Sequence, residues 1–277
     1  MSGDFRTASI VGLGLIGGSL ARDLAARGVR VRAYDTDERQ LDDAVHAGII
    51  NGRIGPGFED IAADLVVIAV PVDAAADVLR RAAPFAGGAR LITDVGSTKA
   101  GIVEVAHLLG LRQRFVGSHP MAGDHRSGWP ASRSGLFADA RVYPCPVRGA
   151  PTEGLDLACR LWTGLGALPE HIDASEHDRR LAWSSHLPHV AAVSIAIAMA
   201  EAGISRGDLG PGGRDMTRLA GSSPEVWTAI ALENAAAIDA ALAGAEREIA
   251  SFRQALTHGD AGELRRRLVA ARNWFEV

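Results

Sequence analysis

The sequence predicts an α/β fold, built on a parallel sheet and followed by an all-helical C-terminal region. From Thr7 to about Ile172, short apolar runs rich in β-branched residues alternate with helical stretches, as in strands joined by crossover helices. Near Asp173 this alternation stops, and no strand-like run follows. The length of 277 residues fits two moderate domains. We therefore expect one domain at residues 1–172 and a second at residues 173–277.

Seven apolar runs are the strand candidates. Continuous runs such as LVVIAV, at residues 65–70, suit strands that are covered on both faces, as crossover helices require. We expect these strands to form a parallel sheet with helices on both faces. The candidates are residues 8–11, 29–34, 65–70, 90–94, 114–117, 141–145 and 168–172.

The C-terminal region contains only helical patterns. The sequence SEHD at residues 175–178 is typical of a capping box that opens a helix. Residues 182–202 are apolar nearly all round, so we expect this helix to be buried in the domain or between the subunits of a homodimer. Five glycines and a proline predict a loop at residues 203–213. Two further helices are expected at residues 224–257 and 260–274.

Composition and charge exclude several classes of partner. Apolar residues make up 47% and charged residues 22% of the chain, which is ordinary for a soluble protein with a sizeable core. The net charge of -4 is mild and both signs are spread along the sequence, so we expect no nucleic-acid partner and no polybasic membrane contact. The N-terminus does not resemble a signal peptide, and the longest apolar run, residues 190–200, is too short to span a bilayer. These features favour a cytoplasmic protein.

No metal site is expected. Cys145 and Cys159 are too few for a disulfide framework and lack metal-ligand spacing, so each is expected to be a small buried side chain in a reducing compartment. His186 and His189 are separated by Pro188, and no carboxylate-rich third ligand accompanies them.

A glycine-rich turn follows the first expected strand. Gly12, Gly14 and Gly17 have GxGxxG spacing, and a helix-compatible stretch follows them. In that context the first glycine permits a tight turn, the second lets the backbone approach a pyrophosphate, and the third lets helix and strand pack closely. The helix N-terminus then offers N–H groups and the positive end of its dipole to the phosphates. The pattern predicts a Rossmann-type dinucleotide site.

Asp35 closes the second expected strand, 23 residues after Gly12. There a carboxylate can accept hydrogen bonds from ribose hydroxyls and repel a 2′-phosphate, which predicts NAD rather than NADP. Val70 and Pro71 end the third strand, where either a nicotinamide-ribose contact or an ordinary loop would fit. The expected cofactor contacts are Gly12, Gly14, Leu15, Ile16, Gly17, Asp35, Val70, Pro71 and Ser97.

Two polar segments follow the fourth and fifth expected strands: DVGSTK at residues 94–99 and GSHPMAG at residues 117–123. Because the carboxyl ends of parallel strands meet at one edge of a sheet, we expect both segments to border the same crevice. Ser97 and His119 would then lie near the nicotinamide. A histidine, whose usual pKa is about 6.5, can accept a proton near neutrality. From the residues alone, a surface histidine in a loop is the competing interpretation.

Five segments, in order, resemble the prephenate/arogenate dehydrogenase family. They are VGLGLIGGSL, DVGSTK, GSHPMAG, HLPH at residues 186–189, and GGRDMTRLAGSSPEVW at residues 212–227. The resemblance extends over most of the chain. It implies an NAD-dependent oxidative decarboxylation of prephenate to 4-hydroxyphenylpyruvate in tyrosine biosynthesis. The apolar helix at residues 182–202 separately predicts a homodimer, with the helical C-terminal region as its dimerisation domain.

The same resemblance implies roles for individual residues. His119 would accept the proton of the ring hydroxyl as hydride leaves for NAD, and Ser97 would touch both this histidine and the nicotinamide. Arg218 is similar to the arginine that holds a substrate carboxylate, and Arg214 would assist it. Loss of the ring carboxylate as CO2 then gives an aromatic phenol, and aromatisation drives the reaction. The other substrate-side candidates are His189, His186, Asp215 and Trp227.

Two positions depart from the family pattern near the substrate mouth. His125 stands where a glutamate is common, and Gly213 stands where an aromatic residue often precedes the basic one. Asp215 could attract the ammonium group of arogenate, or it could pair with Arg214 or Arg218. Because His125 weakens the arogenate case, prephenate is favoured. Arogenate, both substrates or an amino-substituted analogue are the alternatives.

Two other functions remain open. A β-hydroxyacid dehydrogenase would share the two-domain organisation, but such enzymes rely on a lysine in the helical domain, and residues 173–277 contain none. A non-catalytic NAD sensor would need only the glycine loop and Asp35. The presence of Ser97, His119 and Arg218 together favours an enzyme.

Overall fold

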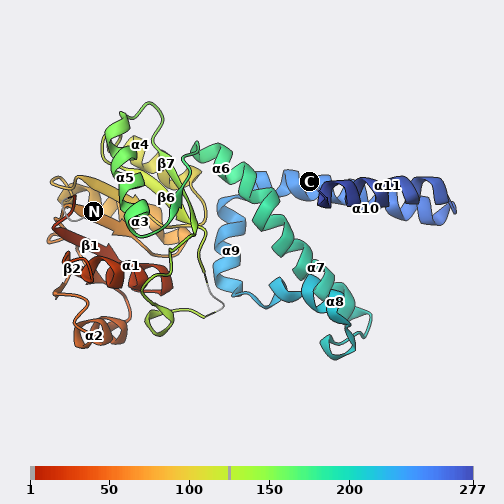
Figure 1. Ribbon diagram of the computed structural model, residues 1–277, viewed down its shortest axis with the longest axis horizontal. Helices are drawn as coiled ribbons and strands as arrows, with labels where there is room; N and C mark the ends of the chain where they lie inside the picture. Colours follow the sequence, from red (N-terminus) through yellow and green to blue (C-terminus); the bar gives the residue numbers. More distant parts are fainter. Residues whose placement is uncertain (1–3, 124–125, 277) are drawn as a thin grey trace. The chain divides into compact units, whose positions relative to one another are not determined.

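The computed structural model of the chain describes residues 4–123 and 126–276 (Figure 1). It divides into two compact units, each described here by itself. Among the described residues, the strands all lie in unit 1, and the regular elements of unit 2 are helices, which confirms the predicted fold class. Unit 1 comprises Met1–Arg180 and Gly221–Asn234, and unit 2 comprises Leu181–Ala220 and Ala235–Val277.

This division differs from the expected boundary between residues 172 and 173. Two helices beyond that boundary, α6 (Ala174–Leu181) and α9 (Pro224–Glu233), fall wholly or largely in unit 1. The side-chain amide of Asn234, directly after α9, donates a hydrogen bond of 2.8 Å to the backbone carbonyl of Asp178 in α6. Long-range contacts of this kind join α6 and α9, which are separated in the sequence by residues of unit 2, so a single boundary in the sequence does not describe the units.

Five parallel strands form the main sheet of unit 1, in the order β3-β2-β1-β4-β5. Since β1 lies between β2 and β4, the direction of winding reverses beside β1, and folds of this kind bind ligands at that point. The strands are β1 (Thr7–Val11), β2 (Arg30–Tyr34), β3 (Gly52–Arg53), β4 (Leu65–Ile68) and β5 (Leu91–Asp94). The helices that follow them are α1 (Leu15–Ala25), α2 (Glu38–His46), α3 (Val72–Ala82) and α4 (Ala100–Leu108).

The central strands and helix α1 share one apolar core. All residues of β4 and β5 are buried, as the continuous apolar runs predicted. Leu20 and Leu24 of α1 are buried against this core. Full burial of one such side chain stabilises the fold by about 1.5–3 kcal/mol. The turns after β1 and β4 are therefore held by well-packed elements.

The remaining strands form a smaller sheet, for which the predicted parallel arrangement is wrong. β6 (Val116–Pro120) pairs antiparallel with β7 (Arg141–Pro146), and β8 (Leu168–Pro169) pairs parallel with β7. A parallel β6–β7 pair would need a crossover connection, usually a helix. The described residues between these strands hold only a short 3-10 turn at Trp129–Ala131. Helix α5 (Thr152–Gly164) connects β7 to β8, which explains why that second pair is parallel.

His119 consequently lies within a strand and not in a loop after one. Every residue of β6 is buried, and β6 runs beside β5, to which one parallel bridge between Ile92 and Phe115 joins it. His119 stands opposite Tyr143 of β7 in the antiparallel register. The interpretation of His119 as a surface residue is therefore wrong.

Helix α6 begins earlier than the expected capping box at Ser175. The carboxylate of Asp173 accepts hydrogen bonds from the N–H of Ser175 (2.9 Å) and from its hydroxyl (2.6 Å). In the expected box Asp178 would be the acidic partner. Its side chain instead accepts hydrogen bonds from the N–H groups of Lys99 and Ala100, in a different part of the chain.

Unit 2 departs from the expected helices at three points. The helix expected at residues 182–202 starts with a π-helical turn, because Pro188 has no N–H to donate to the preceding turn. The helix expected at residues 224–257 is interrupted at Asn234 and consists of two helices. The expected loop contains the start of a helix at Pro211, since proline suits a first helical position. The elements are η3 (Ala182–His186), α7 (Leu187–Glu201), α8 (Pro211–Met216), α10 (Ala235–Thr257) and α11 (Ala261–Phe275).

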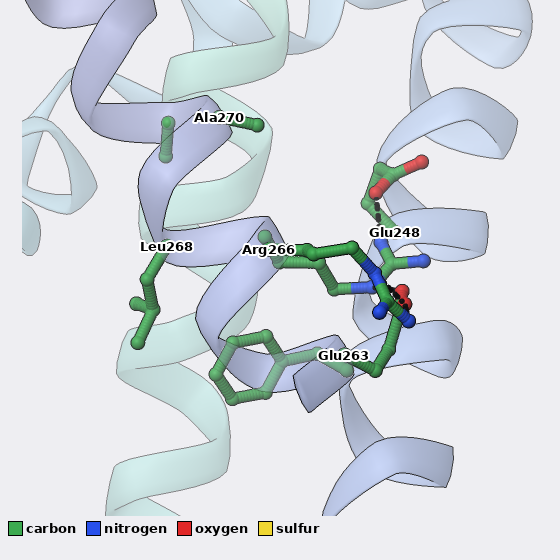
Figure 2. A pocket seen from close by; sticks show the side chains of 8 residues that line it. Glu248, Glu263, Arg266, Leu268 and Ala270 are labelled. Carbon is green, nitrogen blue, oxygen red and sulfur yellow. Dashed lines mark hydrogen bonds and ion pairs between the residues drawn. The ribbon is translucent and has the colours of Figure 1, made fainter. Parts of the chain in front are cut away.

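A groove of about 640 Å³ is lined by residues of α10 and α11 (Figure 2). Phe252 and Leu268 supply apolar surface, and Glu263 pairs with Arg266 at 2.5 Å.

Apolar side chains are also exposed elsewhere in unit 2. Ala192 is the single buried residue of α7, and Ile197 of that helix is 55% exposed.

Within the described residues, one helical run is long and apolar enough to cross a membrane, by length and composition alone. It extends through α6, η3 and α7, Ala174–Glu201, and only 22% of its most apolar stretch is buried within the chain. The pair α9 and α10 passes the same test only if the two bent helices are taken together. The run is longer than the apolar segment considered in the sequence. Helices that are covered by other protein pass this test as well.

Candidate active site

The glycine loop after β1 is shaped by its backbone contacts. Gly12 has φ +98°, and a Cβ atom there would lie 2.3 Å from the carbonyl oxygen of Ala69. A Cβ on Gly17 would lie 2.0 Å from the carbonyl oxygen of Gly12. By contrast, no atom lies within 4 Å of a Cβ built on Gly14. Gly12 and Gly17 are thus needed for packing, while Gly14 leaves space for a close approach of a ligand to the backbone.

Helix α1 begins at this open position. Leu15 and Ile16 form its first turn, with Gly14 as N-cap residue and no acidic side chain in that turn. The first N–H groups of a helix have no partner within it, and the dipole makes this end positive. The loop can therefore hold an anionic group such as a pyrophosphate.

Asp35 lies directly after β2 and is bonded to the glycine loop. The N–H of Leu13 donates to its Oδ2 at 2.6 Å, and the N–H of Asp37 donates to its Oδ1 at 2.9 Å. Gln40 adds a longer bond to Oδ1, at 3.3 Å. These contacts fix a half-buried carboxylate beside the loop. Val70 and Pro71 follow β4, which pairs with β1 on the side opposite to β2.

His119 is joined to two buried side chains that the sequence did not reveal. Its Nδ1 lies 2.9 Å from Nε2 of His177, and Nδ1 of His177 lies 2.8 Å from Oδ1 of Asp178. The exposed fractions are 9% for His119, 0% for His177 and 4% for Asp178. The segment SEHD was interpreted only as a helix start. The adjacent polar residues His177 and Asp178 in that segment were the only sequence feature that could have indicated a buried polar pair.

Asp178 also binds the start of α4, next to the loop that carries Ser97. Its Oδ1 accepts the N–H of Lys99 and its Oδ2 accepts the N–H of Ala100, both at 2.8 Å. The ammonium group of Lys99 forms a buried ion pair with Asp94 at the end of β5. Ser97 is half-buried between these two anchored positions. The DVGSTK segment is therefore held at both ends by charged groups.

The two cysteines take no part in this network as nucleophiles. Cys145 of β7 is buried, and burial raises the pKa of its thiol far above the usual range. Cys159 is half-buried, and burial raises its pKa as well. Both thiols are thus predominantly protonated at neutral pH and poorly reactive. Within residues 4–123 and 126–276, no three histidine, cysteine or acidic side chains are grouped as metal ligands.

The substrate-side candidates are distributed over both units. In unit 2, His186 is buried in the π-helical turn, and Nδ1 of His189 lies 3.0 Å from the carbonyl oxygen of Ser185. Burial lowers the pKa of His189, and the positive charge of Arg218 lowers it further, against the effect of the Ser185 bond. Trp227 belongs to unit 1, where it is half-buried on α9.

Three further candidates are exposed in unit 2: Arg214 and Asp215 on α8, and Arg218 in a short 3-10 turn, Arg218–Gly221. In the described part of the chain, no ion pair within 4 Å joins Asp215 to either arginine. The interpretation of Asp215 as the partner of an arginine is therefore not supported. His125, the other residue that bears on the substrate, lies outside the described residues.

Comparison with known proteins gives matches along most of the chain. Residues 20–170 match the model for the nucleotide-binding domain of prephenate dehydrogenase, and residues 173–270 match the model for its dimerization domain. A prephenate dehydrogenase of Bacillus subtilis (strain 168) is 34% identical over 238 residues, which make up 82% of this chain and 64% of that protein. The chain thus spans 64% of the length of that relative.

Two solved structures are similar over nearly the whole chain. Prephenate dehydrogenase from A. aeolicus, in complex with hydroxyphenyl propionate and NAD+, has a TM-score of 0.88 and 28% identity. The match covers 98% of this chain and 97% of that chain. The arogenate dehydrogenase of Synechocystis has a TM-score of 0.83 and 27% identity, with 98% and 99% of the two chains covered.

Proposed function

Because the chain belongs to the prephenate dehydrogenase family, we propose that it catalyses the NAD-dependent oxidative decarboxylation of prephenate to 4-hydroxyphenylpyruvate in tyrosine biosynthesis. The observation that carries the proposal is the buried imidazole of His119, anchored through His177 in the same unit as a glycine loop with open space at Gly14. This arrangement would provide a proton acceptor and a dinucleotide-binding loop within one compact unit. An NAD sensor without enzymatic activity would need only the loop.

The residues around the glycine loop fit NAD. Gly14, Leu15 and Ile16 would hold the pyrophosphate through backbone N–H groups, and Asp35 would accept hydrogen bonds from the adenosine ribose. Val70 and Pro71 would line the nicotinamide ribose. When bound, NAD supplies the hydride acceptor. The match to a nucleotide-binding domain and the NAD+ in the A. aeolicus relative support this assignment.

His119 would act as the general base. As the hydride leaves the carbinol carbon of the ring with its electron pair, the hydroxyl on that carbon loses its proton to His119. The bond to the ring carboxylate then breaks, CO2 leaves, and its bonding electrons complete an aromatic ring. Ser97 would orient the imidazole and the nicotinamide. Positioning and one base are sufficient, since aromatisation supplies the driving force.

Unit 2 would supply the groups that hold the substrate. Arg218 and Arg214 are exposed guanidinium groups that can bind carboxylates in bidentate geometry. Burial and the charge of Arg218 lower the pKa of His189. Because Nδ1 of His189 donates to the carbonyl of Ser185, the neutral ring has its lone pair on Nε2, which would suit a hydrogen-bond donor of the substrate. His186 and Trp227 would support the pocket. These assignments rest on the family resemblance. We also propose a nucleotide-binding domain at residues 1–172 and a substrate and dimerisation domain at residues 173–277, which the change of sequence pattern near Asp173 and the two family matches support.

Arogenate is the second candidate substrate. Asp215 has no ion pair with either neighbouring arginine among the described residues, so its carboxylate is available to an ammonium group. The similarity to the arogenate dehydrogenase of Synechocystis also keeps this substrate open. Arogenate differs from prephenate by that ammonium group in place of a carbonyl. A dual-specificity enzyme would bind both through the shared ring carboxylate.

We also propose a cytoplasmic homodimer formed through unit 2. The match to a dimerization domain, the nearly uncovered helix α7 and the groove lined by α10 and α11 support a second copy as the covering surface. Such an interface would also account for the long apolar run of α7 without a membrane. Both cysteines are free thiols, which suits a reducing compartment such as the cytoplasm.

The test is a comparison of kcat/KM for prephenate and arogenate with NAD, with chromatography to separate 4-hydroxyphenylpyruvate from tyrosine. We expect prephenate to be the better substrate. His119→Asn should retain NAD binding and lose roughly 100-fold or more in kcat. His107→Asn, an exposed histidine on α4, is the matched control and should retain wild-type turnover. No reduction of NAD with either substrate would refute the proposed activity.

A further inference from the structure

Behind His119 lies a linear chain of three polar side chains. His119 contacts His177 at 2.9 Å, and His177 contacts Asp178 at 2.8 Å. All three are buried, and the rings of His119 and His177 meet edge to face, with centroids 5.1 Å apart. The chain is built from β6 and α6, whose residues are 58 positions apart in the sequence. Hydrogen bonds in such a chain constrain one another, because each nitrogen must either donate or accept.

Asp178 sets the donor-to-acceptor direction of these hydrogen bonds. Both oxygens of Asp178 receive backbone N–H groups, from Lys99 and Ala100 at the start of α4. Backbone N–H groups only donate, and the positive end of the helix dipole favours an ionised carboxylate there. An ionised carboxylate can only accept. Nδ1 of His177 must therefore carry a proton and donate it to Oδ1 of Asp178.

The tautomer of His119 follows from this direction. A neutral His177 that is protonated on Nδ1 has a lone pair on Nε2, the atom that faces His119. Nδ1 of His119 must then be the donor, because two facing lone pairs at 2.9 Å would repel each other. The lone pair of His119 is consequently on Nε2. This is the nitrogen that a general base would use when its other nitrogen is held from behind.

His177 and Asp178 are held in place by three sets of contacts. Asp178 is bonded to the start of α4 through its side chain, and its backbone carbonyl accepts the amide of Asn234 at 2.8 Å. The ring of Tyr143, the cross-strand neighbour of His119, packs against His177 with centroids 5.5 Å apart. The imidazole of His177 thus has little freedom to turn.

We infer that His177 and Asp178 are positioning residues that lock His119 in its Nδ1–H tautomer, with Nε2 directed to the reaction. The inference rests on the proposed function for the source of the proton. When Nε2 takes that proton, the positive charge that forms on His119 is hydrogen-bonded to His177, and the negative charge of Asp178 ends the chain. Neither residue touches the substrate.

The tautomer can be measured on the unmodified enzyme, without substrate. Long-range proton–nitrogen NMR of histidine-labelled protein, at a pH where the rings are neutral, distinguishes the protonated nitrogen of each ring. The His119→Asn and His177→Gln variants assign the signals. We expect Nδ1–H in both His119 and His177. An Nε2–H form of His119 would overturn the inference whether or not the protein oxidises prephenate.

Two substitutions separate positioning from packing. His177→Leu fills the site without an acceptor, and we expect kcat to fall about 10- to 100-fold while KM for NAD changes less than about twofold. His177→Gln offers an amide oxygen to Nδ1 of His119 and should recover much of the loss. His171→Leu, at an exposed histidine close by in sequence, is the control and should match the wild type.

Equal losses for His177→Leu and His177→Gln, or no loss for His177→Leu, would show that His177 is only a packing residue. If the wild type itself oxidises neither prephenate nor arogenate, the proposed function fails, and the NMR result still decides the tautomer.

Discussion

Asp35 carries a single charge at the point where two dinucleotides differ. Its carboxylate is fixed by the N–H groups of Leu13 and Asp37, so it cannot turn away from a ligand without breaking these bonds. A 2′-phosphate beside it would meet a like charge at short range, which costs at least about 1 kcal/mol. A single side chain can therefore set the preference for NAD over NADP.

Asp35→Asn removes the charge and keeps one acceptor, which can serve the N–H of Leu13 while the bond from the N–H of Asp37 is lost. We expect kcat/KM for NADP to rise about 10-fold relative to that for NAD, measured by steady-state kinetics with both cofactors. Asp37→Asn, at the exposed N-cap of α2, should leave the ratio unchanged. Comparable rates of the wild type with NAD and NADP would rule out the role of Asp35.

His189 should make the stability of the fold depend on pH. Burial, followed by the charge of Arg218, lowers its pKa below the value of about 6.5 expected in the unfolded chain. Below pH 6.5 the unfolded state thus binds a proton more readily than the folded state, so stability falls as pH decreases until the folded pKa is reached. At higher pH both states are neutral and this contribution is constant.

The expected result is a larger decrease in Tm between pH 7.5 and pH 5.5 for the wild type than for His189→Asn. The asparagine amide, which lies where Nδ1 lies, can still donate to the carbonyl of Ser185 but does not titrate. Other groups that titrate in this range affect both proteins alike. Parallel Tm profiles would mean that His189 is not held neutral by its surroundings.

At the scale of elements, the β1–α1 turn separates the requirements of folding from those of binding. Gly17→Ala forces a Cβ to within 2.0 Å of a backbone oxygen, and we expect it to lower the free energy of unfolding by at least about 2 kcal/mol. Gly14→Ala meets no protein atom within 4 Å, so it should fold normally. It should still weaken NAD binding about 10-fold, because the methyl group occupies the space into which the phosphate must come.

Denaturant unfolding and calorimetric titration with NAD measure these two effects. The pair serves as its own control, since both substitutions are Gly→Ala within one turn. A Gly14→Ala protein that binds NAD as well as the wild type would move the phosphate site away from this turn.

The course of individual helices was predicted least well at their ends. Asp173 caps α6 in place of Ser175, and the π-helical turn before Pro188 interrupts the expected regular helix. The break at Asn234 depends on a side chain that bonds α6 from a distance of 56 residues. The sequence reveals where a helix can form, whereas the partner that ends it lies elsewhere in the chain.

At the scale of the whole molecule, a second copy is expected to cover the apolar surface of unit 2. Ile197→Glu would put a charge into such an interface at a cost of several kcal/mol, so we expect a monomer in sedimentation velocity experiments. Leu108→Glu, on α4 of unit 1, where the side chain is 74% exposed, should leave the dimer intact. A dimer of unchanged strength in Ile197→Glu would mean that α7 is not at the interface.

The sequence by itself determined the α/β fold, the glycine loop and the family, because each depends on local periodicity or on spacing within one segment. It also pointed to His119 through a short motif. Only the tertiary structure decided that β6 and β7 are antiparallel, that His177 and Asp178 stand behind His119, and that Asp173 caps α6. These features depend on contacts between distant segments and on the competition of each polar group for its partners. No local pattern encodes which of these partners a buried side chain meets.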